Sequence, residues 1–275
     1  MDYVYEIIFS FSEGHNFLNQ QVCREFRSLL AKTHGCVYLD QLLKDGIKVD
    51  FTPSFKMLDL AVKFNLFSLL QACPELASSY VCDMAVKNNN TKVLWWAYQQ
   101  EYKPSDYIYF HVAQYANTEM VKCLIDNGHS WSTHSCSYMA KCGRLDMLEY
   151  LEEQVCSLTG DICAGAAEGG HLEIIKWAME RGFPLTTNAC SGAAGGGHLE
   201  VLQWLRANSC PWDQWTIIAA AGGGHLEVLQ WAIENECPWK FKSTYEKACH
   251  EHHKHVSKWL RENYKEQYET CWDWS

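Results

Sequence analysis

The sequence lacks the long apolar runs and basic stretches that mark several classes of protein. No apolar run reaches the about 20 residues that a membrane-spanning helix needs. The opening residues, Met1-Asp2-Tyr3, lack the basic region of a secretory signal peptide, so we expect a cytoplasmic protein. The formal net charge is −10 and no basic run is longer than a few residues, which argues against nucleic acid and membranes as partners.

Signatures of catalysis are missing as well. Spacing singles out no Ser/His/Asp or Cys/His set, and no paired-carboxylate motif is present. Runs of glycine occur without a preceding strand, so they do not predict a phosphate-binding loop. We therefore expect no enzymatic activity and no cofactor.

A motif that returns every 27 residues organises the chain. Its clearest copies begin at Gly169, Gly196 and Gly223, each reading Gly-Gly-His-Leu-Glu before an apolar run. The period continues upstream in degraded form, so that residues 51–239 divide into seven units. Downstream, His253 to Leu260 matches the pattern only with one inserted residue. Such a period is typical of stacked supersecondary units, whose terminal copies are atypical because their outer faces meet water.

Each unit reads as a pair of helices. The last regular unit predicts a short helix over Thr216 to Gly222, a turn at Gly223-Gly224 and a longer helix over Leu226 to Asn235. Pro238 follows the second helix, which it cannot continue. A chain built from such units is expected to be all-α.

The two predicted helices differ in their faces. The first carries small residues, including Gly165 and Gly192, although glycine costs a helix up to about 1 kcal/mol relative to alanine. We expect close backbone approach between stacked units at these positions. The second helix is apolar apart from one stripe, which includes Glu173, Lys176 and Glu180 and predicts a solvated outer face.

The segment from Cys190 to Leu202 resembles the ankyrin repeat, whose pattern is Leu-His-x-Ala-Ala-x-x-Gly-His-Leu-Glu-Val-Val. The chain departs from that family by lacking the Thr-Pro-Leu-His opening and by its shorter unit, since ankyrin repeats have about 33 residues. The resemblance covers roughly residues 36–265 and implies an ankyrin-type solenoid of helical hairpins with short or missing β-turn fingers. A tetratricopeptide-like array is the competing architecture, but it needs longer paired helices.

The N-terminal residues do not repeat. Leu18, Val22 and Phe26 recur at helical spacing. Ile8 to Phe11 and Val22 to Arg27 together resemble an F-box, although the opening Leu-Pro of that family is absent. The resemblance implies docking on a Skp1-type adaptor through Ile8, Phe9, Leu18, Val22 and Phe26. A plain helical cap on the first repeat is the alternative, and both interpretations can hold together.

Three segments follow from these patterns. Residues 1–35 form the F-box-like or capping segment, residues 36–265 the repeat array with degenerate units at both ends, and residues 266–275 a C-terminal tail. The combination resembles the ankyrin and F-box proteins of large DNA viruses. It implies a monomeric protein, located in the host cell if it is viral. Such a protein would hold a protein target on the concave face of the array and would join this target to a ubiquitin ligase through Skp1. A plain scaffold with no ligase link is the alternative.

Cysteine placement follows the repeat. The chain has 14 cysteines but no CxxC pair. One repeat position holds Cys82, Cys136, Cys163 and Cys190, and another holds Cys156, Cys210 and Cys237. Because free cysteine behaves as a small buried hydrophobe, we interpret these as packing residues in a reducing compartment rather than as disulfides or zinc ligands.

Histidine occurs in two settings. His171, His198 and His225 recur with the glycine runs, so we interpret them as turn residues. His250 to His255 is the densest group of potential metal ligands, but the zincin pattern His-Glu-x-x-His fails there because Lys254 occupies its last position. We interpret this group as solvated histidines of a degenerate repeat and predict no metal site; a metal-dependent activity is the alternative.

Tryptophan also recurs at fixed repeat positions. One position, in the second helix, holds Trp96, Trp177, Trp204 and Trp231, and another, in the following loop, holds Trp131, Trp212 and Trp239. Leucine or tyrosine fills the same positions in other units, so we assign both ladders to packing.

One repeat position changes its chemistry at nearly every step. It lies at the start of the first helix and holds Pro53, Tyr80, Tyr107, His134, Asp161, Asn188 and Trp215. Because the buried positions are monotonous, we expect this varied position to be exposed. Its aromatic members offer large contact area at low entropic cost, so we predict that Tyr80, Tyr107, His134 and Trp215 contact the partner.

Overall fold

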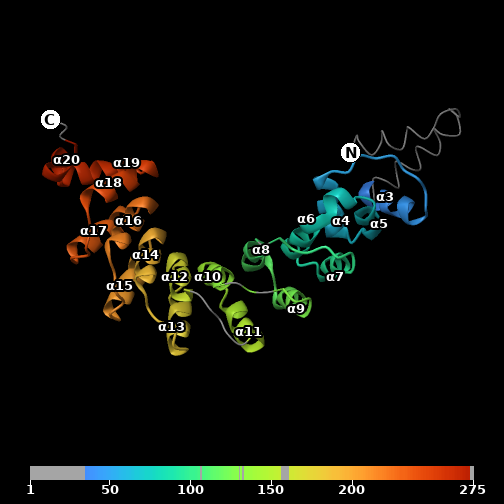
Figure 1. Cartoon of the computed structure of the whole chain (residues 1–275), viewed down its shortest axis with the longest axis horizontal. Helices are drawn as coiled ribbons and strands as arrows, with labels where there is room; N and C mark the ends of the chain where they lie inside the picture. The colour runs from blue at the N-terminus through green and yellow to red at the C-terminus, as the bar shows by residue number, and fades with distance from the viewer. Residues whose placement is uncertain (1–34, 106, 130, 132, 156–160, 273–275) are drawn as a thin grey trace. The chain divides into compact units, whose positions relative to one another are not determined.

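A computed structural model describes residues 35–272 apart from 106, 130, 132 and 156–160. In this part of the chain every regular element is an α-helix, from α3 to α20, and no strand occurs (Figure 1). The predicted all-α class is therefore confirmed. None of these helices is long and apolar enough to cross a membrane. The predicted Skp1-docking residues, Ile8, Phe9, Leu18, Val22 and Phe26, lie outside the described residues.

The helices fall into two compact units that divide after His129. The first unit contains α3 (Gly35–Lys44), α4 (Phe55–Phe64), α5 (Phe67–Gln71), α6 (Pro74–Lys87), α7 (Thr91–Gln99), α8 (Ile108–Tyr115) and α9 (Thr118–Asp126). The second contains α10 (Thr133–Lys141), α11 (Leu145–Val155), α12 (Ile162–Gly169), α13 (Leu172–Glu180), α14 (Thr187–Gly196), α15 (Leu199–Ala207), α16 (Gln214–Gly223), α17 (Leu226–Glu234), α18 (Phe241–His250), α19 (Lys254–Asn263) and α20 (Lys265–Trp272). The division lies inside the predicted repeat array.

The helices reproduce the period found in the sequence. The second helices of six consecutive pairs begin 27 residues apart, at Thr91, Thr118, Leu145, Leu172, Leu199 and Leu226. The next, α19, begins at Lys254, one residue later than the period requires. The inserted residue predicted before His253 is therefore confirmed.

In the pair formed by α16 and α17 the first helix is not the shorter one, contrary to the prediction for that unit. α16 has 10 residues and α17 has 9. α16 begins early because the side chain of Asp213 accepts a hydrogen bond from the backbone N–H of Trp215 at 2.9 Å. It also continues through Gly223, so that only Gly224, with φ +78°, leaves the helical conformation.

Close packing between first helices builds the core of the second unit. α14 packs against α12 on one side and α16 on the other, and α10 and α18 extend the same row. A Cβ atom added to Gly192 in α14 would lie only 2.6 Å from the carbonyl oxygen of Ala164 in α12. The predicted close backbone approach is thus confirmed, and glycine at this position is required by it.

The repeated cysteines are buried free thiols, which confirms their packing role. Cys82, Cys136, Cys163 and Cys190 are buried, as are Cys210 and Cys237, whereas Cys156 lies outside the described residues. The Cys210 thiol donates a hydrogen bond to the carbonyl oxygen of Thr186 at 3.3 Å, and that of Cys237 does the same to Asp213 at 3.4 Å. Each thiol thus joins two stretches of chain that lead into successive first helices.

Histidine side chains also connect neighbouring pairs. His171 precedes α13, and its Nε2 lies 3.0 Å from the carbonyl oxygen of Lys141 in α10. In the same way, Nε2 of His198 lies 3.1 Å from the carbonyl oxygen of Glu168, and Nε2 of His253 lies 2.9 Å from that of Gly222. Burial lowers the pKa of the His225 imidazole, in the same position before α17. The predicted turn role is confirmed, and these side chains also bond to the preceding pair.

The C-terminal end of the array is covered by aromatic packing. Most of the segment predicted as a tail lies in α20, whose Tyr268 ring is 5.3 Å from Tyr245 and 6.4 Å from Phe241, both in α18. Val256 and Leu260 are fully buried in α19, a helix that packs against both α18 and α20. α20 therefore packs over aromatic side chains of α18 and contacts α19.

Candidate functional site

The predicted contact position is largely exposed. Tyr107 is 68% exposed and Trp215 is 60% exposed, and His134 is exposed as well. Tyr80 is only partly accessible. Tyr80 and Tyr107 belong to the first unit, and His134 and Trp215 belong to the second. Each unit therefore contains two of the four predicted contact residues.

Tyr80 is held by neighbouring side chains. Its hydroxyl donates a hydrogen bond to Oδ1 of Asp59 at 2.5 Å, and its ring centroid lies 4.8 Å from that of Phe55. Burial, together with the hydrogen bond and charge of Asp59, raises the pKa of Tyr80 to about 12. Asp59 and Phe55 thus hold the side chain of Tyr80 in place, which gives it a structural role beside any contact role.

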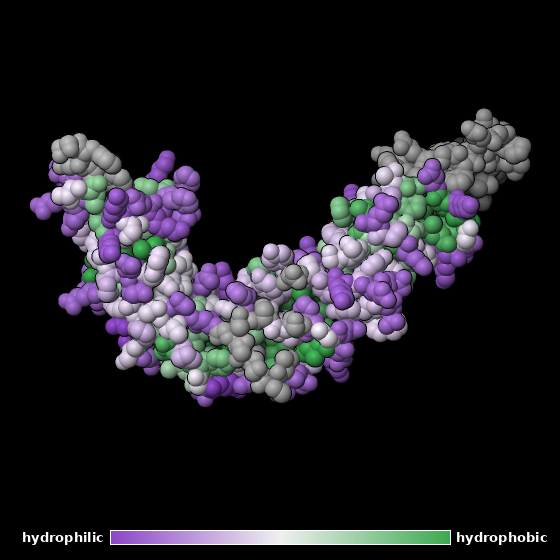
Figure 2. Space-filling view, viewed as in Figure 1, coloured by the Kyte–Doolittle hydropathy of each residue, from purple (hydrophilic) through white to green (hydrophobic). Residues whose placement is uncertain are grey.

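Tyr107 belongs to a surface group of aromatic rings in the first unit. It precedes α8 and stacks on Phe110 at 6.3 Å between ring centroids, and Phe110 lies 4.3 Å from Tyr109. Phe55, at the start of α4, is 53% exposed. Because α6 packs against both α4 and α8, we call the rings of Phe55, Tyr80, Tyr107 and Phe110 the aromatic edge. Figure 2 shows other hydrophobic residues gathered over α3 and α5, which both pack against α4.

In the second unit, hydrogen bonds hold two residues of the varied position. The Asp161 carboxylate accepts hydrogen bonds from Thr186 Oγ1 and Asn188 Nδ2, each at 2.9 Å. It also caps α12 by accepting from the N–H of Ala164 at 3.0 Å. Asp161 and Asn188 are thus matched to each other, and Trp215 is the exposed aromatic member of this unit.

The tryptophan ladders are packed less fully than predicted. Trp177 is buried, but Trp96, Trp204 and Trp231 are only partly buried, and so are Trp131, Trp212 and Trp239. Arginine covers two of these rings, since the guanidinium carbon of Arg181 lies 4.4 Å from the Trp177 centroid and that of Arg206 lies 4.2 Å from Trp212. Most of these indoles therefore pack on one side and meet cations or solvent on the other.

The predicted outer stripe is exposed. Glu173, Lys176 and Glu180 all lie on the solvent side of α13. The Lys176 ammonium is 5.8 Å from the centroid of Trp204 in α15. This face of the second unit is therefore charged, as expected.

The histidine group near the C-terminus does not converge. His250 and His252 are exposed, as predicted, but His253 is partly buried and bonds to Gly222 as described, and His255 Nε2 lies 2.7 Å from the carbonyl oxygen of Gly224. The prediction of uniformly solvated histidines is wrong because His253 occupies the position that His225 holds one pair earlier. Within the described ranges no three His, Cys, Asp or Glu side chains come together to hold a metal ion.

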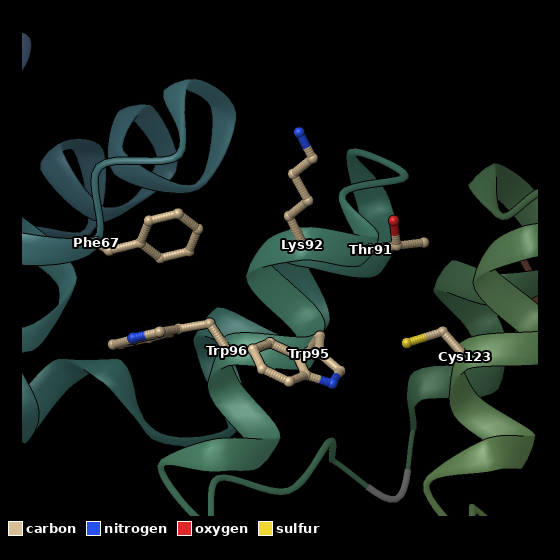
Figure 3. A pocket seen from close by; sticks show the side chains of 6 residues that line it. All are labelled: Phe67, Thr91, Lys92, Trp95, Trp96 and Cys123. Carbon is tan, nitrogen blue, oxygen red and sulfur yellow. The ribbon is translucent and has the colours of Figure 1, made fainter.

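A hollow of about 530 Å³ lies on the first unit between α5, α7 and α9. It is lined by Phe67, Thr91, Lys92, Trp95, Trp96 and Cys123, which we call the α7 hollow (Figure 3). Trp96 lies on the side of Phe67, with 5.9 Å between ring centroids, and Trp95 lies nearer Cys123. Trp95 is 58% exposed. The search for recurring tryptophans missed this residue because Trp95 stands outside both ladders.

Comparison with known proteins identifies no family for the chain. The resemblances to ankyrin repeats and to the F-box therefore stay predictions from the sequence. No protein-family model matches the sequence, and no curated protein matches it significantly.

Proposed function

We propose that the chain is an ankyrin-type repeat adaptor that holds a protein target and docks through its N-terminal segment on the Skp1 component of a ubiquitin ligase. Support for the repeat architecture comes from helix pairs that recur every 27 residues and from their stacked first helices. Residues 208–213 connect α15 to α16 without a strand, as expected for a repeat with no β-turn finger.

The observation that favours target binding is the exposure of large aromatic rings at the starts of the first helices. Tyr107 and Trp215 each leave more than half of their surface in water. Tyrosine and tryptophan are enriched at the centres of protein interfaces. A protein target bound along these helix starts would cover them.

Co-purification tests the ligase link. We expect the wild-type chain to capture purified Skp1 and the double variant Ile8→Ser/Phe26→Ser to capture none, because an F-box docks through apolar helix faces. The helical signal and melting temperature of the variant should match those of the wild type. Tyr107→Ala is the matched control and should still capture Skp1. A wild-type chain that leaves Skp1 unbound would make the protein a plain scaffold with an N-terminal cap.

Alanine substitutions test the target surface, with a target captured from host cells and identified by mass spectrometry. Tyr107→Ala and His134→Ala should each weaken target binding about tenfold or more, since truncation of an interface anchor costs at least 1–2 kcal/mol by rough estimate. Their melting temperatures should not fall, because both side chains are exposed. Glu173→Ala and Lys176→Ala should change binding little; the reverse result would place the target on the outer stripe.

A further inference from the structure

Three side chains that line the α7 hollow depart from the pattern of the later repeats. The second helices begin in phase, so each position of α7 has counterparts in α9, α11, α13, α15 and α17. Trp95, Lys92 and Cys123 each differ in kind from the residues at their counterpart positions. All three departures meet at one place on the surface.

Trp95 stands where the later helices are polar. The counterparts are Lys122, Glu149, Lys176, Gln203 and Gln230. This is the solvated stripe, so an indole there gains little from packing and remains 58% exposed. A large exposed indole at a position that otherwise holds charged or amide side chains is typical of a contact residue.

Cys123 stands where the other second helices carry a large ring. The same position holds Trp96, Tyr150, Trp177, Trp204 and Trp231. The thiol fills much less space than an indole, and the hollow lies beside it. The missing ring of α9 therefore leaves room for an apolar group from outside.

Lys92 is basic, whereas the residues at the same position of the later second helices are acidic. The counterparts are Glu119, Asp146, Glu173, Glu200 and Glu227. An acidic residue in the first turn of a helix is favoured by the helix dipole, and a lysine there is disfavoured. Lys92 forms no ion pair with any described residue, and it stands at the upper rim of the hollow in Figure 3. The rim thus offers a cation that has no ion-pair partner in the described part of a chain that is acidic overall.

We propose that the α7 hollow binds a protein segment that presents a large apolar side chain next to a carboxylate. The apolar side chain lies against Trp95 in the space left at Cys123, and the carboxylate pairs with Lys92. The hollow is open to solvent along α7, so it suits one anchor side chain of a longer segment better than an enclosed small molecule. This surface is separate from the aromatic edge and does not depend on a ligase link.

Selection of random phage-displayed peptides on the wild-type chain tests the proposal. Peptides that bind the triple variant Lys92→Glu/Trp95→Gln/Cys123→Trp are first removed. We expect the remaining peptides to share a large apolar residue beside Asp or Glu. A synthetic copy of the dominant peptide, measured by fluorescence anisotropy, should bind Lys92→Glu and Cys123→Trp at least about tenfold more weakly than the wild type.

The substitutions are chosen to preserve folding, because each introduces a residue that another repeat already has at that position. Equal melting temperatures check this. Lys176→Gln, at the Trp95 position of α13, is the matched control and should bind the peptide as the wild type does. Selection of basic peptides, of no common sequence, or of peptides that bind Lys92→Glu and Cys123→Trp equally well would overturn the proposal. A dimer of the chain that is lost in Cys123→Trp would assign the hollow to a second copy instead.

Discussion

Gly192→Ala is expected to lower the free energy of unfolding by about 2 kcal/mol, although alanine is the better helix former. The new methyl group would lie 2.6 Å from the carbonyl oxygen of Ala164 and 3.3 Å from the backbone nitrogen of Glu168. Both atoms belong to the main chain of α12, so no side-chain rotation relieves the contact. α12 and α14 must move apart, which weakens an interface on which the stack depends. Urea denaturation followed by circular dichroism measures the loss.

Gly195→Ala provides the matched control for this prediction. It introduces the same methyl group one turn later in α14, where the nearest atom is the Cβ of Ala219 at 3.5 Å, an ordinary contact. The helix should gain up to about 1 kcal/mol, because alanine restricts the unfolded chain more than glycine does. If both variants were stabilised, the first helices would not pack as closely as the structure places them.

The repeat pattern in the sequence predicted the all-α class and the spacing of most helices. The period predicted where six consecutive second helices begin, from α7 to α17, and the glycines in the first helices predicted the close approach seen at Gly192. Helix length was less predictable, because a glycine pair can either break a helix or continue it. In α16 the first glycine of the pair, Gly223, stays helical and only Gly224 turns, which depends on the contacts of the folded chain.

The candidate sites were predicted in part. Variation along the repeat correctly pointed to exposure at Tyr107 and Trp215. The same variation misled at Asp161, where the residue is set by hydrogen bonds to the following pair, which lies 25 to 27 residues further along the chain. The α7 hollow could also have been predicted from the sequence, because Trp95 and Lys92 differ from the residues at the same positions of the other repeats. A search for recurring residues does not find such exceptions.

Leu202→Ala is expected to cost about 3–4 kcal/mol of unfolding free energy, more than the removal of the much larger Trp204 side chain in the same helix. Leu202 is completely buried, so its removal leaves a cavity in α15 that the neighbouring pairs cannot easily close. Trp204 is only partly buried, with Lys176 as a cationic neighbour at 5.8 Å.

Trp204→Ala should therefore cost about 1–2 kcal/mol, roughly half of what a fully buried tryptophan contributes. The two variants, compared by urea denaturation under one set of conditions, decide what the ladder does. A larger loss for Trp204→Ala than for Leu202→Ala would make the ladder part of the core. A larger loss for Leu202→Ala, which we expect, would mean that buried aliphatic residues form the core between the helices. The tryptophans of the ladder would then be partly exposed contacts between one helix pair and the next.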